Sequence, residues 1–394
     1  MPGPKVLIYL DRLLRLPYKL LLPLFAGNSK RYVSSTDDKV VVIKMMGIGS
    51  ITRIVRSLKT SNVDLDKTLF VTLASNADLC KVLGVTNTHF VNDKNLFTLV
   101  WGLFKLNILL RSQKPKHLIN YERGSNILGL FQLISTVFCP TRIISFHDFE
   151  KDIITNKAAI YTIDKKNFQY LINKTIPFFK TTKRSDTPRM ELVVNTKKVI
   201  ININASDYMP YRKYSIEGFE KVIRALNQWD YTLSYDLIGS AEEKVYVDRL
   251  IRRISDLDAT INNRCGQWSL SDLVTNLTDC AVLITNDSGP MHLGALVKIP
   301  MITIWGPTSS RYFGYKSPYI KNIQAYTDCS PCFLYAKSQG AKACNRRIDC
   351  MKEISPEEIF REAQRKLTNL DLFRMVDVAH VKHIKERSDF NLVS

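Results

Sequence analysis

The chain contains 394 residues, 56 of them basic and 37 acidic, so its formal net charge is +19. At about 150 residues per domain this length predicts two or three domains, and a content of 45% apolar and 24% charged residues excludes a disordered chain. A membrane-spanning helix needs about 18 consecutive apolar residues, and the sequence has no such run, so we expect a soluble or surface-attached protein. The charge favours phosphates, nucleic acid or an anionic membrane surface as partner without choosing among them.

Residues 1–38 are predicted to form a basic, leucine-rich extension that ends in a polar linker. The leucines are interleaved with Lys5, Arg12, Arg15 and Lys19, a pattern typical of an amphipathic segment among lipid headgroups. A helix packed on the protein's own domain has the same pattern, and both interpretations stay open. Because the segment lacks a small-residue cleavage site after a clean apolar run, we expect a cytoplasmic location.

A first α/β domain is predicted over residues 39–190. Its strands are expected where short apolar runs occur, at residues 39–44, 68–73, 117–121 and 142–145. Helices are expected over residues 51–58 and 126–138. Strands that alternate with helices predict a parallel sheet with right-handed crossovers.

A second α/β domain is predicted over residues 191–360, followed by a C-terminal tail over residues 361–394. Its expected strands are residues 198–204, 231–238 and 280–285, and its expected helices are residues 216–229, 242–250 and 272–278. The architecture is therefore α/β, with two doubly wound, Rossmann-like domains facing a cleft.

The most informative segment is the turn after the strand expected at residues 280–285. Asp287-Ser288-Gly289 ends that strand, and Pro290 suits the first turn of a helix. Backbone N–H groups at a helix start attract anions, Gly289 permits close approach of a phosphate, and His292 follows within reach of the same ligand. A helix-capping Asp287 and a packed His292 would have the same local pattern.

This turn and the segment Ile299-Pro300 to Gly306-Pro307-Thr308 resemble glycosyltransferase family 9, the heptosyltransferase family. The opening strand with Gly47 and Gly49, the segment from Ile201 to Asn204, and Gly239-Ser-Ala-Glu-Glu243 are similar to further family motifs. The resemblance implies a GT-B fold and a metal-independent, inverting transfer of a sugar, heptose above all, from a nucleotide diphosphate to a lipopolysaccharide or other surface glycan. It also implies the cytoplasmic face of the inner membrane as a peripheral location and an ADP-heptose-like donor. A nucleic-acid partner is not expected, because the sequence contains no aromatic-basic stacking motif and no zinc-finger histidine pair.

The resemblance also implies roles for single residues. Asp287, a catalytic candidate, with Ser288, Gly289 and His292 would hold the donor diphosphate or sugar. The remaining donor-binding candidates are Asn204, Arg212 near the phosphates, and Glu243 near the nucleoside. A solvated charge at a helix start is the alternative for Glu243.

The acceptor-side turn departs from the family pattern at Gly49-Ser50, where the family normally has Gly-Asp and the Asp resembles a general base. Serine has no useful basicity at neutral pH, so another base is needed. Glu122 is the substitute candidate, because it follows a strand at the edge where open α/β sheets bind ligands. A surface ion pair is the alternative for Glu122, and His147 and Asp148 are weaker candidates. Ser50 also supports a second hypothesis, a catalytically degenerate member that binds nucleotide sugar or glycan without transfer.

Four cysteines lie close together near the end of the second domain, at Cys329, Cys332, Cys344 and Cys350. Four thiolates from two short loops suit a tetrahedral metal, so the spacing predicts a structural Zn or Fe site within the loop 329–350. Two disulfides or four free thiols are the alternatives.

Overall fold

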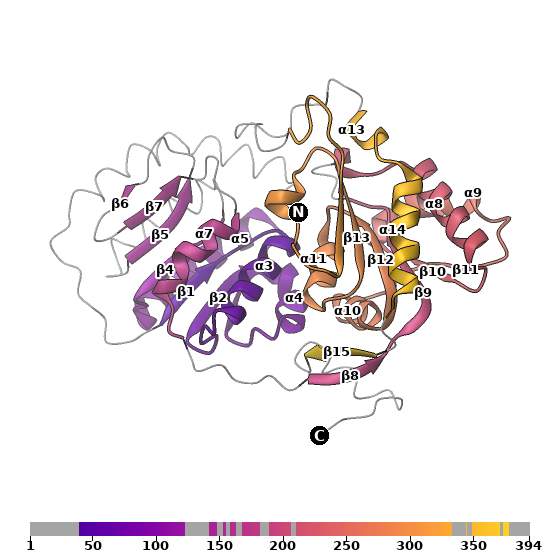
Figure 1. Cartoon of the computed structure of the whole chain (residues 1–394). Helices are drawn as coiled ribbons and strands as arrows, with labels where there is room; N and C mark the ends of the chain where they lie inside the picture. Colours follow the sequence, from indigo (N-terminus) through magenta and orange to yellow (C-terminus); the bar gives the residue numbers. More distant parts are fainter. Residues whose placement is uncertain are drawn as a thin grey trace. The chain divides into compact units, whose positions relative to one another are not determined.

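The computed structural model describes most of the chain as two compact units, Met1–Ser185 and Asp186–Ser394 (Figure 1). The described residues are 39–122, 142–147, 153–154, 158–162, 168–181, 189–205, 210–332, 344, 349–370 and 373–377. The extension over residues 1–38 and the helix predicted over 126–138 lie outside these ranges. Within them, every helix is too short or too polar to cross a membrane.

The first unit is built on a seven-stranded sheet with the order β3-β2-β1-β4-β5-β7-β6. Its strands are β1 (Val40–Ile43), β2 (Thr68–Leu73), β3 (Thr88–Val91), β4 (His117–Asn120), β5 (Arg142–His147), β6 (Ile153–Ile154) and β7 (Ala158–Thr162). All neighbours pair in parallel except β6, which runs antiparallel to β7.

Helices connect these strands and cover the sheet. They are α3 (Ile48–Thr60), α4 (Ala77–Val82), α5 (Leu96–Gln113) and α7 (Phe168–Thr175), with short 3-10 turns η1 (Ala74–Asn76) and η2 (Ile176–Phe178). Side chains alternate between the two faces of a strand. Val41 and Ile43 of β1 therefore point to one face, where they pack with Leu106 and Leu110 of α5.

The second unit is built on a six-stranded, fully parallel sheet with the order β11-β10-β9-β12-β13-β14. Its strands are β9 (Asn195–Asn202), β10 (Ser234–Leu237), β11 (Thr260–Asn263), β12 (Cys280–Asn286), β13 (Met301–Trp305) and β14 (Ile320–Gln324). The central strand β12 is buried along its whole length, which is why its sequence is a continuous apolar run.

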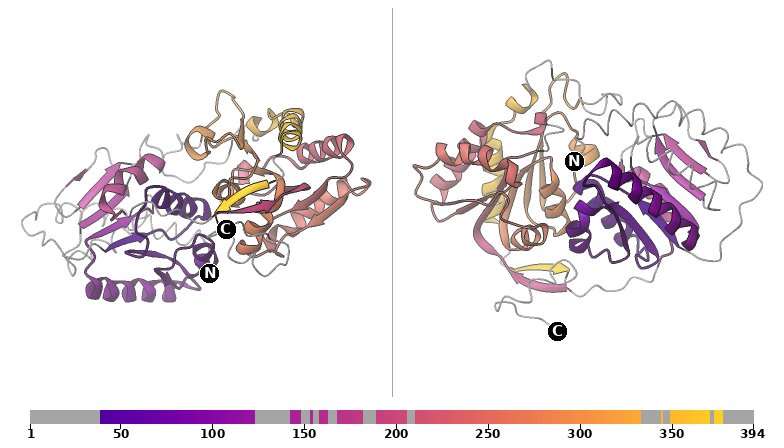
Figure 2. Two further views of the ribbon diagram at one scale, coloured as in Figure 1. Left: turned by 60° about the horizontal axis from the view of Figure 1, so that its bottom comes forward. Right: turned by 180° about the vertical axis from the view of Figure 1, so that it is seen from behind.

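Helices lie on both faces of this sheet (Figure 2). They are α8 (Ile216–Trp229), α9 (Lys244–Arg253), α10 (Leu270–Asp279), α11 (Gly289–Leu296), α12 (Ser310–Phe313), α13 (Asp349–Lys352) and α14 (Pro356–Thr368), with 3-10 turns η3 (Pro210–Arg212) and η4 (Ala241–Glu243). The core of one face contains Phe219 of α8, Leu250 of α9 and Ile359 of α14. Gly294 of α11 lies against Leu283 and Met301, whose side chains point to the opposite face.

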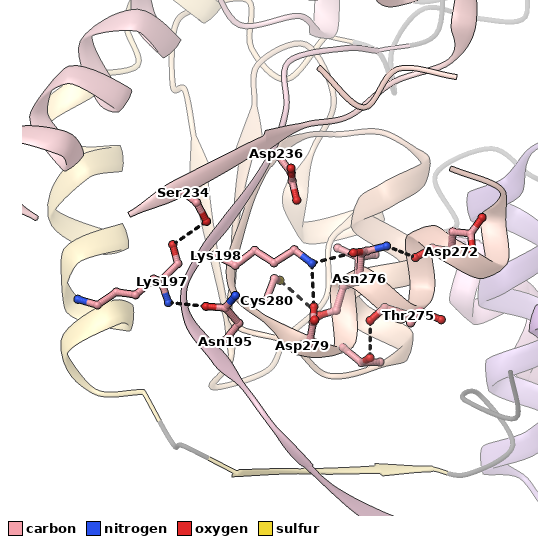
Figure 3. A network of polar contacts seen from close by, with 12 residues as sticks. Asn195, Lys197, Lys198, Ser234, Asp236, Asp272, Thr275, Asn276, Asp279 and Cys280 are labelled. Carbon is pink, nitrogen blue, oxygen red and sulfur yellow. Dashed lines mark hydrogen bonds and ion pairs between the residues drawn. The ribbon is translucent and has the colours of Figure 1, made fainter. Parts of the chain in front are cut away.

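Polar contacts between β9 and α10 fix the position of the central strands (Figure 3). The ammonium group of Lys198 donates to the side-chain oxygens of Asn276, at 2.7 Å, and Asp279, at 3.1 Å. A separate antiparallel pair joins β8 (Arg189–Val193) to β15 (Phe373–Asp377), so the C-terminal tail pairs with the start of its own unit.

Most predicted elements coincide with observed ones to within a few residues, and the helix at Ile216–Trp229 has the predicted bounds. The helix predicted from residue 51 begins three residues earlier, at Ile48, and the strand predicted over residues 198–204 is shifted to Asn195–Asn202. The sequence analysis missed α5, the longest helix in the described part of the chain.

Candidate functional site

Both sheets contain the strand order that creates a ligand site in open α/β folds. In the second unit the sequence-order pattern is 3-2-1-4-5-6, and in the first unit β3-β2-β1-β4-β5 has the same start. Ligands of such sheets bind beyond the carboxyl ends of the strands where the order reverses. These switch points lie between β9 and β12 and between β1 and β4, and the residues predicted from sequence follow these strands.

An ion pair occupies the switch point of the second unit. Arg212, in η3, donates from Nη1 to the Oδ2 atom of Asp287 at 3.2 Å. The Asp287 side chain is only 6% exposed and that of Arg212 17%, so both charges are largely removed from water. Asp287 is thus paired with a cation, and Ser288 takes the N-cap position of α11.

The start of α11 keeps the features of an anion site. The Ser288 side chain makes no capping hydrogen bond, and Pro290 lies in the first turn. Instead, Asn202 donates from Nδ2 to the Ser288 hydroxyl at 2.6 Å and to the Thr285 hydroxyl at 2.9 Å. The backbone N–H groups of a helix's first turn have no partner within the helix. At the start of α11 they are therefore suited to bind an anion.

Three buried polar atoms near this switch point have no hydrogen-bond partner among the residues that the structure describes. They are Nε of Arg212, Oδ1 of Asn204 and Oγ1 of Thr308, which follows β13. Leaving a buried polar atom unpaired costs about 1–3 kcal/mol, and such atoms in folded proteins usually meet water or a ligand. An edge that combines unpaired donors and acceptors with a cation and a helix start is suited to a polar, anionic ligand.

Glu243 lies at the neighbouring strand end and serves as a helix cap. Its Oε2 accepts from the backbone N–H of Ser240 at 2.8 Å, in a capping box that starts η4. A Cβ atom added to Gly239 would come within 2.5 Å of Asn204 Nδ2 and 3.0 Å of Glu243 Oε2. The missing side chain of Gly239 therefore allows Asn204 and Glu243 to approach the same point.

His292 lies in the second turn of α11 and pairs with an aromatic residue that sequence analysis did not single out. Its Nδ1 is 2.7 Å from the hydroxyl of Tyr315, and the two rings meet edge to face. The pair fixes the orientation of the imidazole, so its other ring nitrogen has a defined direction.

The switch point of the first unit holds a second ion pair, between Lys44 and Glu122. Lys44 Nζ donates to Glu122 Oε1 at 2.7 Å, while the backbone N–H groups of Met45 and Met46 donate to Oε2 at 3.0 and 3.3 Å. A carboxylate has about four acceptor positions, of which three are used here. Glu122 thereby fixes the chain between β1 and the turn at Gly47.

The acceptor-side candidates Gly49 and Ser50 lie in the first turn of α3. Gly47, directly before the helix, has φ of +92°, a conformation that only glycine adopts readily. Of the weaker base candidates, His147 ends β5, and Asp148 lies outside the described residues.

The metal predicted at the four cysteines is not supported. Among the described residues, which include all four thiols, no group of three or more metal-binding side chains has an arrangement that could hold an ion. Cys350 is buried beside Gly306, whereas Cys332 and Cys344 are exposed. Burial, followed by the charges of the other thiols, raises the pKa of Cys350 to about 11.

Four residues of these sites escaped the sequence analysis: Lys44, Asn202, Thr308 and Tyr315. Lys44 and Thr308 were visible only as parts of family motifs, and the partner of Lys44 is 78 residues away. A polar residue inside an apolar strand, as Asn202 is in β9, was the available signal for that position, because it must find a partner or a ligand.

Comparison with known proteins shows what part of the chain is similar to. The family model "Glycosyltransferase family 9 (heptosyltransferase)" matches residues 161–343. The lipooligosaccharide heptosyltransferase 2 of Campylobacter jejuni is 28% identical over 191 residues, which are 46% of this chain and 55% of that protein. The chain thus spans about half the length of the curated relatives it matches.

Two solved structures show the fold. Heptosyltransferase II of E. coli superposes with a TM-score of 0.58 at 14% identity, covering 84% of this chain and 98% of that one. The E. coli heptosyltransferase WaaC, determined with ADP, superposes with a TM-score of 0.56 at 10% identity, covering 83% and 99%. The fold is therefore GT-B, with a parallel α/β sheet in each of two domains.

Proposed function

Because residues 161–343 carry a glycosyltransferase family 9 domain and the chain has the GT-B fold, we propose that this protein transfers a sugar from a nucleotide-diphosphate donor to a lipopolysaccharide or other surface glycan. The observation that carries the proposal is the Arg212–Asp287 pair beside the uncapped start of α11. The names of the relatives favour heptose as the sugar, and the neighbour determined with ADP favours an ADP-linked donor.

The donor diphosphate would lie at the switch point of the second unit. The amides at the start of α11 and the Arg212 guanidinium would neutralise the phosphates, and the unpartnered Nε of Arg212 supplies one further donor. With these groups in place the leaving diphosphate needs no metal ion, so we propose metal-independent transfer. Asp287, Ser288, Gly289 and His292 would orient the phosphate and sugar.

The nucleoside would extend toward Gly239. Glu243 could accept from ribose hydroxyls there with the oxygen that does not cap η4, and the Asn204 side-chain amide lies beside the same point. Thr308, at the end of β13, supplies a hydroxyl on the other side of β12.

The proposed reaction is a direct displacement at the anomeric carbon. An acceptor hydroxyl forms the new C–O bond as the bond to the diphosphate breaks, and its proton passes to a general base. One displacement inverts the anomeric configuration. Glu122 is the candidate base, but three donors already occupy its carboxylate, so its contacts support the positioning of the turn before Gly47 more directly than proton transfer.

A member that binds nucleotide sugar without transfer is not favoured, because the similar proteins are named as transferases. Because the relatives are named for lipooligosaccharide and lipopolysaccharide, which contain lipid, a peripheral location on the cytoplasmic face of a membrane is part of the proposal.

Calorimetric titration with ADP, GDP, UDP and dTDP tests the donor site. Selective, micromolar binding of ADP is expected, and binding of none of the four would contradict the proposal. Release of ADP from ADP-heptose only when a glycan acceptor is present, unaffected by EDTA, would then establish metal-independent transfer. NMR of the product's anomeric centre would show inversion or retention.

A further inference from the structure

Helix α5 has two apolar faces, of which the first unit buries only one. Leu106 and Leu110 pack in the core, and Leu99, Leu103 and Leu109 pack partly against it. The opposite face carries five large apolar side chains that are between 50% and 78% exposed: Phe97, Val100, Trp101, Phe104 and Ile108. With about 100° of rotation per residue, these five side chains occupy one arc of about 100°.

This exposed face, which we call the α5 stripe, is a continuous surface and not a set of scattered residues. It runs from Phe97 to Ile108, a length of about 16 Å at 1.5 Å per residue. Trp101 stacks on Phe104 with 5.4 Å between ring centroids, so the two largest side chains form one surface. A soluble helix that is apolar on all sides is normally buried, and the α5 stripe therefore requires a partner.

The charges around the stripe indicate the chemistry of that partner. Residues 94–116 contain five basic residues, at 94, 105, 111, 114 and 116, and no acidic residue. Lys94, Lys105 and Lys114 are exposed, and Lys105 Nζ lies 5.8 Å from the centre of the Trp101 ring. The nearest acidic residue in sequence is Asp93, which accepts a hydrogen bond from Ser75.

We propose that the α5 stripe is a membrane-docking surface that lies flat in the headgroup region of an anionic lipid bilayer. Large apolar side chains on one face, a tryptophan at the interface and lysines that reach out to lipid phosphates are the features of an interfacial helix. A protein partner fits less well, because lysine is depleted from protein interfaces. The Asn95–Thr98 capping box fixes the start of α5, so the stripe exists before the membrane is met.

The docking holds the first unit at the surface where a lipid-linked glycan is found. It does not depend on the donor site, because vesicle binding is measured without nucleotide. Failure of vesicle binding would leave the proposed transfer untouched, and failure of ADP binding would leave the docking untouched.

The test is flotation of the full chain with vesicles of phosphatidylethanolamine and phosphatidylglycerol at 3:1, and with phosphatidylcholine vesicles. We expect salt-sensitive binding to the anionic vesicles only. The exposed double variant Trp101→Ser/Phe104→Ser should lower the partition coefficient by about tenfold or more. Its matched control, Tyr231→Ser/Tyr326→Ser, removes two exposed aromatic side chains of the second unit and should bind like the wild type.

Charge-reversal variants provide a second test of the proposed docking surface. Lys94→Glu/Lys105→Glu should abolish the preference for anionic lipid, whereas Lys221→Glu/Arg252→Glu, with the same change in net charge on exposed residues of the second unit, should retain it. Brominated lipid should quench the wild type more than Trp101→Phe, which keeps an aromatic side chain and should still bind.

Two outcomes would overturn the proposal. If Trp101→Ser/Phe104→Ser, with an unchanged circular dichroism melt, binds vesicles like the wild type, another surface such as residues 1–38 carries the binding. If the wild type ignores anionic vesicles but forms a dimer that this variant disperses, a second copy covers the stripe.

Discussion

Removing the Arg212 guanidinium should destabilise the second unit as well as weaken donor binding. The Asp287 side chain is 6% exposed, and its Oδ2 has Arg212 Nη1 as a partner at 3.2 Å. Arg212→Met leaves this carboxylate buried beside an apolar side chain. Breaking a buried pair from one side costs about 3–5 kcal/mol, so we expect a loss of that size in the free energy of unfolding.

Two further variants separate the energy of the ion pair from the separate contributions of Arg212 and Asp287. Asp287→Asn leaves Arg212, whose side chain is 17% exposed and can reach water, so a loss of about 1–2 kcal/mol is expected. The double variant Arg212→Met/Asp287→Asn contains no buried charge at this position. It should lose about 1–2 kcal/mol, far less than the sum of the single losses, which gives a coupling energy of about 3–5 kcal/mol.

Tryptophan fluorescence can follow this unit alone. The chain has four tryptophans, and in a Trp101→Phe background the remaining three, Trp229, Trp268 and Trp305, all lie in the second unit. Urea titration of each variant in this background reports the unfolding of that unit. Because Trp305 is fully buried, its emission should change strongly on unfolding.

Nucleotide gives the functional readout of the same variants. At 100 times its dissociation constant, ADP should stabilise the wild type by about 2.7 kcal/mol. Loss of a charged hydrogen bond to phosphate costs about 1.5–3 kcal/mol, so Arg212→Met should bind ADP about 10- to 100-fold more weakly. Additive losses in the double variant, together with unchanged ADP affinity, would refute both the buried pair and its role at the phosphates.

Four further predictions follow from single contacts. Lys44→Met/Glu122→Gln keeps an acceptor for the two backbone amides, so it should retain most of the turnover if Glu122 positions the turn; a fall in kcat of about 10²–10⁴ would instead make Glu122 the base. Ser50→Asp should raise turnover, because it restores the family carboxylate; no change in the pH–rate profile would exclude a base at this position. Thr308→Val should leave the stability of the free protein unchanged or higher, since its hydroxyl has no partner in the described part of the chain, while lowering affinity for ADP-heptose; equal affinity would remove Thr308 from the proposed site. Cys350 should react with iodoacetamide at pH 7.5 far more slowly than the exposed thiols, because burial raises its pKa to about 11; mass spectrometry showing early modification would contradict this.

Local chemistry explains why the turn at the proposed donor site could be predicted from the sequence. The run from Cys280 to Asn286 is buried on both faces, and Asp-Ser-Gly-Pro ends such a strand and starts a helix within a few residues. All of these preferences act between neighbours in sequence, so the turn at Asp287 to Gly289 was visible in advance.

The ion pairs were not visible, because they join distant segments. Arg212 and Asp287 are 75 residues apart, and Lys44 and Glu122 are 78 apart. Each pair forms only because the strand order places two strand ends side by side, which no local pattern specifies. Sequence analysis placed the candidates at strand ends and offered Glu122 as a base or as a member of a surface ion pair. In the structure its carboxylate accepts from Lys44 and from two backbone amides.

Helix α5 was missed for a different physical reason. Helix prediction depends on a polar face alternating with an apolar one at a period of 3.6 residues. In α5 apolar residues occupy both the core-facing side and the exposed side, so the periodic signal cancels. The missing periodicity carries information of its own. A helix with apolar residues on two faces normally buries both, one in its own core and the other against a partner.

The two switch points differ in how far their buried polar groups are hydrogen-bonded, which indicates different roles. At the first, the carboxylate of Glu122 accepts hydrogen bonds from Lys44 and from the amides of Met45 and Met46, so its charge is balanced within the protein. At the second, Arg212 and Thr308 each have a buried polar atom that no other described residue pairs with, and a bound ligand would offset this unfavourable burial. A bound anion is therefore expected at the second switch point, whereas the first maintains the shape of a turn. Because three donors already engage the Glu122 carboxylate, the response of turnover to Ser50→Asp is the more direct test of where a general base is needed.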